Sequence, residues 1–379
     1  MNKVKNLAIF SVGDVLGSVI SAGFWLILAS LILPEEFGEI HYFIGIAGLG
    51  YTISLIGTSD VLSVYISKKI EVKKILTIIS LVAGIIASII VSIFFSKIEL
   101  GLLIMGYIVN DIAIGYFLGR KKFSTYSKNI LLQRGLTFSL GFLFYFIFGS
   151  EGIILALGLS YMHLSIIIFK ILRKSKINFP LFKNRFGFII TNYGISLSGN
   201  FRNQLDKIIL MPIIGFDILG NYALAIQAYA ILMIVSNIFY KFILPHDSSN
   251  QNVKNFKFLI ILISIGIAAF GMTIGPSILE YIFPKFASVG IAIQILSLAI
   301  IPTTISLLLT SKFLSNENSK IVLTGRIIAT VTVIILLLIL TPIYGLVGAT
   351  SAFVISSVVR TCFFFWAYKY GERENNTSA

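Results

Sequence analysis

The chain consists of long apolar runs separated by short polar gaps. A helix needs about 20 residues to cross the hydrocarbon core of a bilayer, and twelve runs are near or above that length. The pattern therefore predicts an all-α, polytopic membrane protein with about twelve transmembrane helices. We expect these helices at 8–33, 39–67, 75–96, 100–119, 128–148, 152–172, 188–212, 217–244, 257–276, 287–311, 320–341 and 345–369.

The composition agrees with this interpretation. The 379 residues are 57% hydrophobic and 12% charged, with a mean hydropathy of +0.95, whereas soluble domains carry about 25% charged residues. A soluble globular fold is therefore excluded. The first apolar run follows a basic start and continues to Leu33 without a small-residue cleavage site. We expect it to be retained as the first helix and not removed as a signal peptide.

The basic residues are concentrated in every second gap between the apolar runs. If the amino terminus and alternate gaps face one side of the membrane, 23 lysines and arginines fall on that side and only Lys97 and Lys285 fall on the other. Because translocation disfavours cationic loops, this asymmetry predicts a plasma-membrane protein with both termini in the cytoplasm. The net charge of +14 then lies mostly in short loops beside anionic lipid, so no nucleic-acid partner is expected.

The chain divides near its midpoint. The longest break between apolar runs, 173–187, is basic and contains a proline, and we interpret it as a cytoplasmic linker between two six-helix lobes at 1–172 and 188–379. Six helices per lobe make both lobes start on the same side, so the repeats are expected to be parallel, as in transporters. Positions that match at an offset of 192 or 193 are Lys128 and Lys320, Arg134 and Arg326, and Gly152 and Gly345.

No enzyme or cofactor motif is present in the short loops. The sequence contains no phosphate-binding G-x-x-x-x-G-K-[ST] loop, no H-E-x-x-H and no Cys/His cluster, and Cys362 is its only cysteine. We therefore expect neither an enzyme nor a bound cofactor or metal. The energy source must be an ion gradient or the gradient of the substrate itself.

The seventh predicted helix has one polar face. At 100° per residue, a stripe about 100° wide contains Tyr193, Ser196, Asn200, Asn203, Gln204 and Lys207, while Arg202 and Asp206 lie nearly opposite. Polar groups at membrane depth are expensive and usually functional, so we expect this helix to line a substrate lumen. The predicted lumen residues are Lys207, Arg202, Asn200, Asn203 and Gln204. The alternative for Arg202 and Asp206 is a mutually neutralising pair.

Four carboxylates are candidates for ion coupling. They lie within predicted helices and could bind H⁺ or Na⁺, or could instead pair with nearby arginines. The candidates are Asp14, Asp60, Asp111 and Asp206.

Three arginines lie at similar depth near the predicted cytoplasmic ends of their helices: Arg134, Arg326 and Arg360. The fork of a guanidinium suits phosphate, and two of the three are repeat-related, so we predict a phosphate-binding inner mouth. The alternative is that each side chain extends to the inner interface of the bilayer.

Small residues and one proline predict local packing. The pair Gly13 and Gly17 has the G-x-x-x-G spacing of close helix contacts. Pro302 interrupts the tenth predicted helix and should bend it by removing a backbone donor.

Two segments resemble a known family. LPEEFGEIHYF at 33–43 and LDKIILMPIIGFDILGNYALAIQ at 205–227 resemble polysaccharide-biosynthesis flippases of the multidrug/oligosaccharidyl-lipid/polysaccharide exporter superfamily. In that family pattern Asp206 and Lys207 match an acidic-basic step, and Gly38 and Gly220 match the glycine that opens helices two and eight.

The resemblance implies movement of a polyprenyl-(di)phosphate-linked oligosaccharide from the inner to the outer leaflet by alternating access, for assembly of a cell-surface glycan. It implies a lipid-linked glycan as substrate, membrane lipid and glycan-assembly proteins as partners, and possibly H⁺ or Na⁺ as coupling ion.

Two alternatives belong to other functional classes. A cation-coupled multidrug exporter of the same superfamily would use Asp14 as its coupling site, but acidic residues should then outnumber basic ones at membrane depth, which they do not. A membrane-embedded glycan polymerase would need a large outer loop, and the sequence has none.

Overall fold

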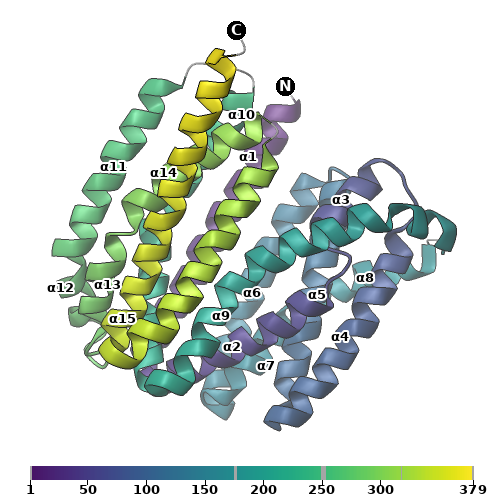
Figure 1. Ribbon diagram of the computed structural model, residues 1–379. Helices are drawn as coiled ribbons and strands as arrows, with labels where there is room; N and C mark the ends of the chain where they lie inside the picture. The colour runs from purple at the N-terminus through teal and green to yellow at the C-terminus, as the bar shows by residue number, and fades with distance from the viewer. Residues whose placement is uncertain (1, 175–176, 249–252, 317, 378–379) are drawn as a thin grey trace. The chain divides into compact units, whose positions relative to one another are not determined.

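The computed structural model describes residues 2–174, 177–248, 253–316 and 318–377, and this part of the chain is helical with no strand (Figure 1). One short 3-10 helix, η1, covers Met162–Leu164. The α-helices are α1 Asn2–Leu31, α2 Pro34–Ser54, α3 Ser59–Ser67, α4 Lys73–Phe95, α5 Ile98–Gly119, α6 Phe123–Phe148, α7 Glu151–Ser160, α8 Ser165–Lys174, α9 Phe179–Leu232, α10 Ile234–Ser248, α11 Lys254–Thr273, α12 Gly275–Ile282, α13 Val289–Ser297, α14 Ile300–Ser315 and α15 Ser319–Thr377.

The chain forms two compact units. Unit 1 comprises Met1–Leu28 and Ile40–Leu205, and unit 2 comprises Ala29–Glu39 and Asp206–Ala379. Each boundary lies inside a helix, so the units are joined by continuous helices in α1, α2 and α9. The predicted linker at 173–187 lies partly outside the described residues, and the division into lobes at that linker stays a prediction.

Helix α9 reverses direction at Gly215. This residue has φ +74°, a backbone conformation that favours glycine. The hydroxyl of Tyr222 donates to Oδ2 of Asp206 over 3.1 Å, although 16 residues of uninterrupted helix would separate the two by about 24 Å. The two arms of α9 therefore fold back on each other.

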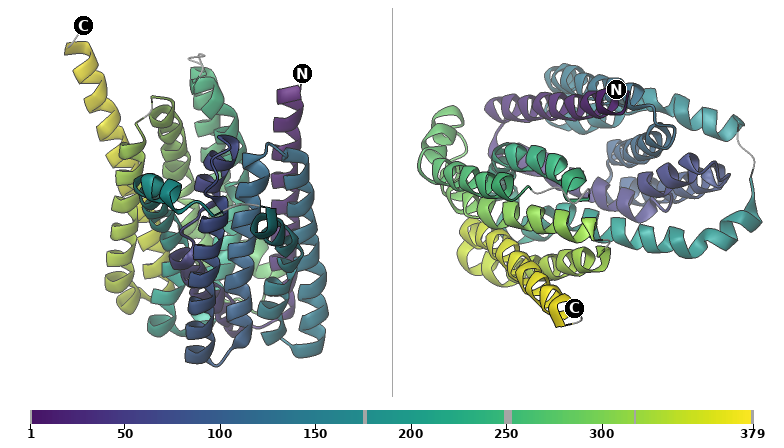
Figure 2. Two further views of the ribbon diagram at one scale, coloured as in Figure 1. Left: turned by 90° about the vertical axis from the view of Figure 1, so that its right-hand side faces the viewer. Right: turned by 90° about the horizontal axis from the view of Figure 1, so that it is seen from above.

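Helix α15 reverses in the same way at Gly345, with φ +53°. A Cβ built on Gly325 would collide with the ring of Phe364, and one built on Gly348 would collide with the carbonyl of Leu340. The two arms thus run side by side, as the green-to-yellow part of Figure 2 shows. Composition and length alone give nine membrane-length helices in the described residues, or ten with the bent pair α13–α14. Counting the two arms of α9 and of α15 separately adds two to the ten, which gives twelve membrane-length segments in the described residues, as predicted.

Two predicted helices are broken, so their continuous form was wrong. The run 39–67 is interrupted at 55–58, where Thr58 adopts an extended backbone and its hydroxyl caps α3 by accepting from the Val61 amide. The run 152–172 contains η1 between α7 and α8. Hydropathy alone does not detect these breaks, because the residues at 55–58 are apolar or small and η1 contains only one strongly polar residue, His163. The bend predicted near Pro302 is confirmed, since α13 and α14 meet at 42° just before it.

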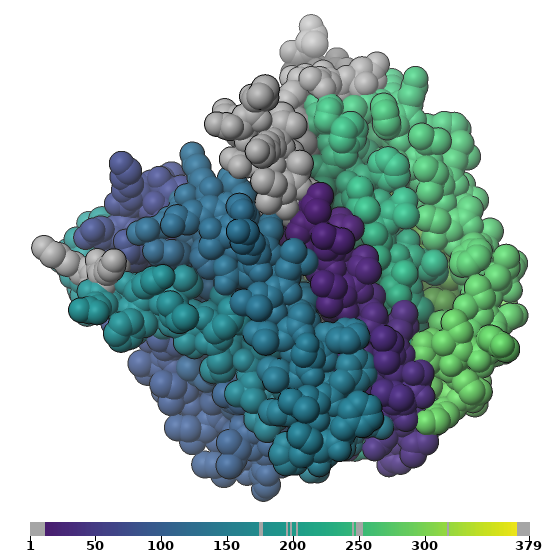
Figure 3. Space-filling model, turned by 180° about the vertical axis from the view of Figure 1, so that it is seen from behind, coloured from purple at the N-terminus to yellow at the C-terminus, as the bar shows by residue number. Residues whose placement is uncertain are grey.

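Helices α1 and α6 pack closely in unit 1. A Cβ on Gly13 would overlap Ser127, and a Cβ on Gly17 would lie 2.9 Å from Ile130, which confirms the predicted packing role of this glycine pair. Further along, the ring of Phe24 lies 6.4 Å from that of Phe138. Residue numbers rise together along both helices, so the helices are parallel. Figure 3 shows α1 in purple lying along α6 in blue.

The two segments that carry the family resemblance contact each other in unit 2. A Cβ on Gly38 would collide with the Phe216 carbonyl, and a Cβ on Gly220 would collide with the Pro34 carbonyl. Each glycine meets the backbone of a residue that lies four positions before the other glycine, so the contact is symmetric. Only glycine allows backbones to approach this closely, which explains why both segments contain one.

The two lysines that break the charge asymmetry both have partners. The Nζ of Lys285 donates to the Leu31 carbonyl at the end of α1 over 3.0 Å. Lys97 lies 3.4 Å from Glu151 and over the ring of Phe43. Their charges therefore serve local contacts within each unit.

Candidate functional site

Arg134 of α6 lies within unit 1 and is half-buried. Its Nη1 donates to the hydroxyl of Ser21 on α1 over 3.5 Å. On α6, the neighbouring residue Gln133 donates to the hydroxyl of Ser160, next to Tyr161, over 3.2 Å. A guanidinium beside a hydroxyl can bind an anion and the hydroxyl groups of a polar ligand.

Asp14 lies two helical turns before Ser21 on the same helix. It is half-buried, and its Oδ1 accepts a hydrogen bond from the Tyr126 hydroxyl over 3.0 Å. Tyr126 in turn lies two turns before Arg134 on α6. Because α1 and α6 are parallel and closely packed, the structure brings the predicted coupling residue Asp14 and the predicted phosphate ligand Arg134 onto one pair of helices.

Asp111 of α5 lies next to the break between α2 and α3. Its Oδ2 accepts from the amide of Ser59 over 2.6 Å, and its Oδ1 accepts from the hydroxyl of Tyr51 over 3.2 Å. The ring of Tyr51 lies 5.6 Å from that of Tyr107, which lies 5.5 Å from that of Tyr161. A row of edge-to-face tyrosines thus leads from Asp111 to Tyr161, which follows Ser160, the hydrogen-bond partner of Gln133 on α6.

Asp60 is exposed in the first turn of α3. A carboxylate in this position stabilises the positive end of the helix dipole. This local role accounts for its presence near the break.

The polar face of the seventh predicted helix is divided between the units. In unit 1, Asn200 and Gln204 are half-buried, and the Tyr193 hydroxyl donates to the Ile53 carbonyl over 2.6 Å. A Cβ on Gly48 would overlap the Gln204 amide, so this side chain packs against α2. In unit 2, Lys207 is half-buried. The side chains of Arg202 and Asn203 lie outside the described residues.

Asp206 has partners of its own in unit 2. Its Oδ2 accepts from the Tyr222 hydroxyl, and its Oδ1 accepts from the amide of Lys207 over 2.8 Å. The carboxylate therefore holds the two arms of α9 together. Whether Arg202 also pairs with it stays a prediction.

The remaining arginines of the predicted inner mouth lie in unit 2. Arg326 is exposed, and Arg360 is half-buried with its Nε 3.4 Å from the hydroxyl of Ser306 on α14. Since Arg134 belongs to unit 1, a joint phosphate site of all three stays a prediction.

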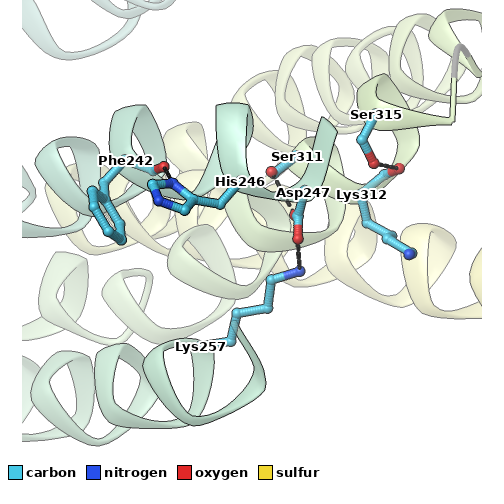
Figure 4. Close-up of polar contacts among 7 residues, drawn as sticks. All are labelled: Phe242, His246, Asp247, Lys257, Ser311, Lys312 and Ser315. Atoms are coloured by element: carbon cyan, nitrogen blue, oxygen red, sulfur yellow. Dashed lines mark hydrogen bonds and ion pairs between the residues drawn. The ribbon is translucent and has the colours of Figure 1, made fainter. Parts of the chain in front are cut away.

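One buried charge pair was missed by the sequence analysis. Asp247, at the end of α10, is only 8% exposed. Both of its oxygens lie 2.8 Å from Nζ of Lys257 on α11, and Oδ2 also accepts from Ser311 of α14 over 2.7 Å (Figure 4). Lys257 was counted only as a loop charge. The useful signal was the aspartate directly after a long apolar run.

Helix α14 carries a series of hydroxyls that also escaped the sequence analysis. Each bonds to a different helix of unit 2, and the grouping of three hydroxyl residues within four positions is the available signal. The pairs are Thr303 with Tyr229 (3.0 Å), Thr304 with Ser236 (2.8 Å) and Ser306 with Thr361 (2.7 Å). In the described residues, no three His, Cys, Asp or Glu side chains are grouped to hold a metal ion.

Comparison with known proteins finds matches by structure but not by sequence. No protein-family profile and no curated protein matches the sequence. Solved structures do match. A multidrug resistance MATE family transporter of the MOP superfamily, inward-facing, has a TM-score of 0.72 at 18% identity and covers 96% of each chain. The chain has the fold of a membrane transporter.

Two further structures extend this result. The lipid II flippase MurJ, in its inward closed conformation, has a TM-score of 0.73 at 13% identity over 96% of this chain and 87% of its own. The Vibrio cholerae MATE transporter VcmN, in its bent form, has a TM-score of 0.56 at 12% identity over 98% and 96%. These neighbours are transporters and a flippase, not enzymes. The predicted all-α polytopic fold is confirmed.

Proposed function

We propose that the protein flips a polyprenyl-(di)phosphate-linked oligosaccharide from the inner to the outer leaflet by alternating access. The observation that carries this proposal is the setting of Arg134, a half-buried guanidinium 3.5 Å from the hydroxyl of Ser21, on the pair of helices that also carries Asp14 and Tyr126. A lipid-linked glycan has an anionic head and many hydroxyl groups, and this set of side chains matches both. One structural neighbour is a lipid II flippase.

The remaining lumen residues extend the same chemistry. Asn200 and Gln204 supply amides that bond to sugar hydroxyls, and Lys207 supplies a second cation. We assign Arg202 and Asn203 to the same lumen from the sequence pattern. Arg326 and Arg360 then provide further phosphate ligands at the inner mouth, and the substrate comes from enzymes that assemble the glycan on its lipid.

We propose Asp14 as the coupling residue for H⁺ or Na⁺. Its carboxylate accepts a hydrogen bond from the Tyr126 hydroxyl, on the pair of helices that carries Arg134, so proton uptake or cation binding there would change the charge of this pair of helices. Asp111 and Asp206 each accept a backbone amide, and Asp60 is exposed, which makes them weaker candidates.

The second candidate function is cation-coupled export of organic cations. It is favoured by the same Asp14–Tyr126 pair and by the MATE transporters among the structural neighbours. In that case Arg134 would repel the cargo at close range.

Reconstituted vesicles separate the two functions. Purified protein should move a fluorescent polyprenyl-diphosphate oligosaccharide between leaflets, and Arg134→Gln should slow this movement while Asn129→Ala, on the same helix, should not. Movement of ethidium and not of the glycan by the parent protein would reject the flippase proposal in favour of the exporter.

The proposed orientation, with both termini in the cytoplasm, can be tested separately. In a Cys362→Ala background, a cysteine at Lys128 should resist an impermeant thiol reagent added to intact cells, because it faces the cytoplasm. A cysteine at the exposed Glu151, just beyond the other end of α6, should react. The reverse pattern would invert the topology.

A further inference from the structure

The break between α2 and α3 is held from α5. Three residues one turn apart on α5 contact α3 in succession: Asp111, Gly115 and Gly119. Asp111 accepts the Ser59 amide, a Cβ on Gly115 would lie 2.8 Å from the Ser59 carbonyl, and a Cβ on Gly119 would lie 2.7 Å from Ile66. One face of α5, formed by these three residues, therefore packs closely against α3.

The position of Asp111 beside the start of α3 favours a structural role for its carboxylate. The first amides of a helix lack intrahelical partners, and the helix dipole adds positive potential at this end. A carboxylate placed there is stabilised as an anion. A coupling cation would be held better by the carbonyls at a helix carboxyl end, which is the opposite arrangement.

Asp111 is also linked to the proposed substrate site. Its second oxygen accepts from Tyr51, whose ring contacts Tyr107, one turn before Asp111 on α5. The ring of Tyr107 lies 5.5 Å from that of Tyr161, and Ser160, the residue before Tyr161, accepts a hydrogen bond from Gln133, the residue before Arg134, over 3.2 Å. Moving α3 or Tyr51 would therefore shift aromatic side chains that pack toward the part of α6 that carries Arg134.

We infer that Asp111 is a positioning residue of the proposed glycan site, and not an ion-coupling residue: it holds the start of α3 and fixes the tyrosine row that packs toward the part of α6 that carries Arg134. This inference rests on the proposed function for its effect on transport, but its structural part is independent of the cargo.

Hydrogen exchange tests the structural part. Asparagine can accept the Ser59 amide with its oxygen and bond to the Tyr51 hydroxyl with its NH₂ group, whereas alanine can do neither. In the purified full-length protein, Asp111→Ala should speed exchange of the amides at 59–61 by about tenfold or more, the result of losing about 1.4 kcal/mol or more of local stability. Asp111→Asn should leave it nearly unchanged. Asn110→Ala is the matched control on the same helix.

Transport in vesicles tests the functional part. Asp111→Ala should raise the apparent KM for the polyprenyl-diphosphate oligosaccharide by about tenfold, as expected when a hydrogen bond worth about 1.4 kcal/mol is lost. Asp111→Asn, which keeps both hydrogen bonds, should restore it with its response to an ion gradient intact. Loss of that response in Asp111→Asn, or equal exchange in the alanine and asparagine variants, would overturn the inference.

The same measurements keep the two proposals apart. If the parent protein moves ethidium instead of the glycan, the proposed function fails, and the Asp111 variants are compared on that cargo. The inference about Asp111 is then tested only by the amide hydrogen exchange of its variants and by the response of Asp111→Asn to an ion gradient.

Discussion

The two units use polar groups in different ways. In unit 1, the carboxylates of Asp14 and Asp111 receive hydrogen bonds from phenols and a backbone amide. In unit 2, the buried carboxylate of Asp247 is bound by a lysine and a serine. A carboxylate held by a lysine forms a neutral pair, whereas hydrogen bonds from a phenol or an amide add no charge of their own.

The repeat-related arginines show the same contrast. Arg134 and Arg326 occupy equivalent sequence positions, yet Arg134 is half-buried against Ser21 while Arg326 is exposed. Equivalent positions in the two halves therefore have different environments. We infer that Arg134 contributes more to substrate binding than Arg326, and that the Asp247–Lys257 pair and the hydroxyls of α14 mainly hold the helices of unit 2 together.

The largest expected effect concerns the buried pair of unit 2. Lys257→Ala leaves the Asp247 carboxylate, whose side chain is 6% exposed, without its cation. We expect the free energy of unfolding to fall by about 3–5 kcal/mol, measured by denaturant unfolding in mixed micelles. Asp247→Ala should cost less, because the side chain of Lys257 is 24% exposed and can reach solvent.

The double variant Asp247→Ala, Lys257→Ala should recover part of the loss, since it leaves no buried charge. The exposed carboxylate Asp217 is the control, and Asp217→Ala should change stability by less than about 0.5 kcal/mol. A stable, inactive Lys257→Ala protein would show that unit 2 takes part in transport directly, and the contrast between the units would be lost.

The next effect compares the two arginines. Arg134→Gln should weaken binding of the polyprenyl-diphosphate oligosaccharide by about 1–3 kcal/mol, roughly 5- to 150-fold, because it removes charge-assisted hydrogen bonds. Arg326→Gln should weaken it by less, because the exposed side chain loses mainly screened, long-range attraction. Binding to purified protein measures both. Equal losses would mean that the repeats share one phosphate site after all.

A smaller effect is expected for ion coupling. Asp14→Asn keeps a hydrogen-bond acceptor for Tyr126 but cannot change charge. A tenfold ion gradient supplies about 1.4 kcal/mol per coupled monovalent ion, so loss of coupling should reduce gradient-driven accumulation by up to about tenfold. Movement of the substrate between the leaflets of vesicles without an ion gradient should be retained. A variant that still responds to the gradient would remove Asp14 from the coupling mechanism.

The sequence predicted the larger features of the fold and missed those that depend on contacts across helices. The twelve segments were predicted from the length of the apolar runs. A close helix contact at Gly13 and Gly17 was predicted from the spacing of the two glycines, and the structure shows that the partner helix is α6. The break at 55–58 was missed because its residues are apolar or small. Asp14 and Arg134 were found by their charge, but the row of Tyr51, Tyr107 and Tyr161 was not, since a tyrosine within an apolar run resembles any other core residue.

The smallest effect tests the hydroxyl series of unit 2. Ser306 and Thr361 are buried and lie 2.7 Å apart across α14 and α15. Hydrogen bonds between membrane helices contribute on average about 0.6 kcal/mol in double-mutant cycles. Ser306→Ala, Thr361→Val and the double variant should therefore give a coupling energy near that value, with transport unchanged. Because Ser306 also contacts Arg360, a much larger coupling energy or a loss of glycan transport would indicate that this hydroxyl pair orients the arginine for substrate. Unit 2 would then have to be described, like unit 1, as part of the transport site.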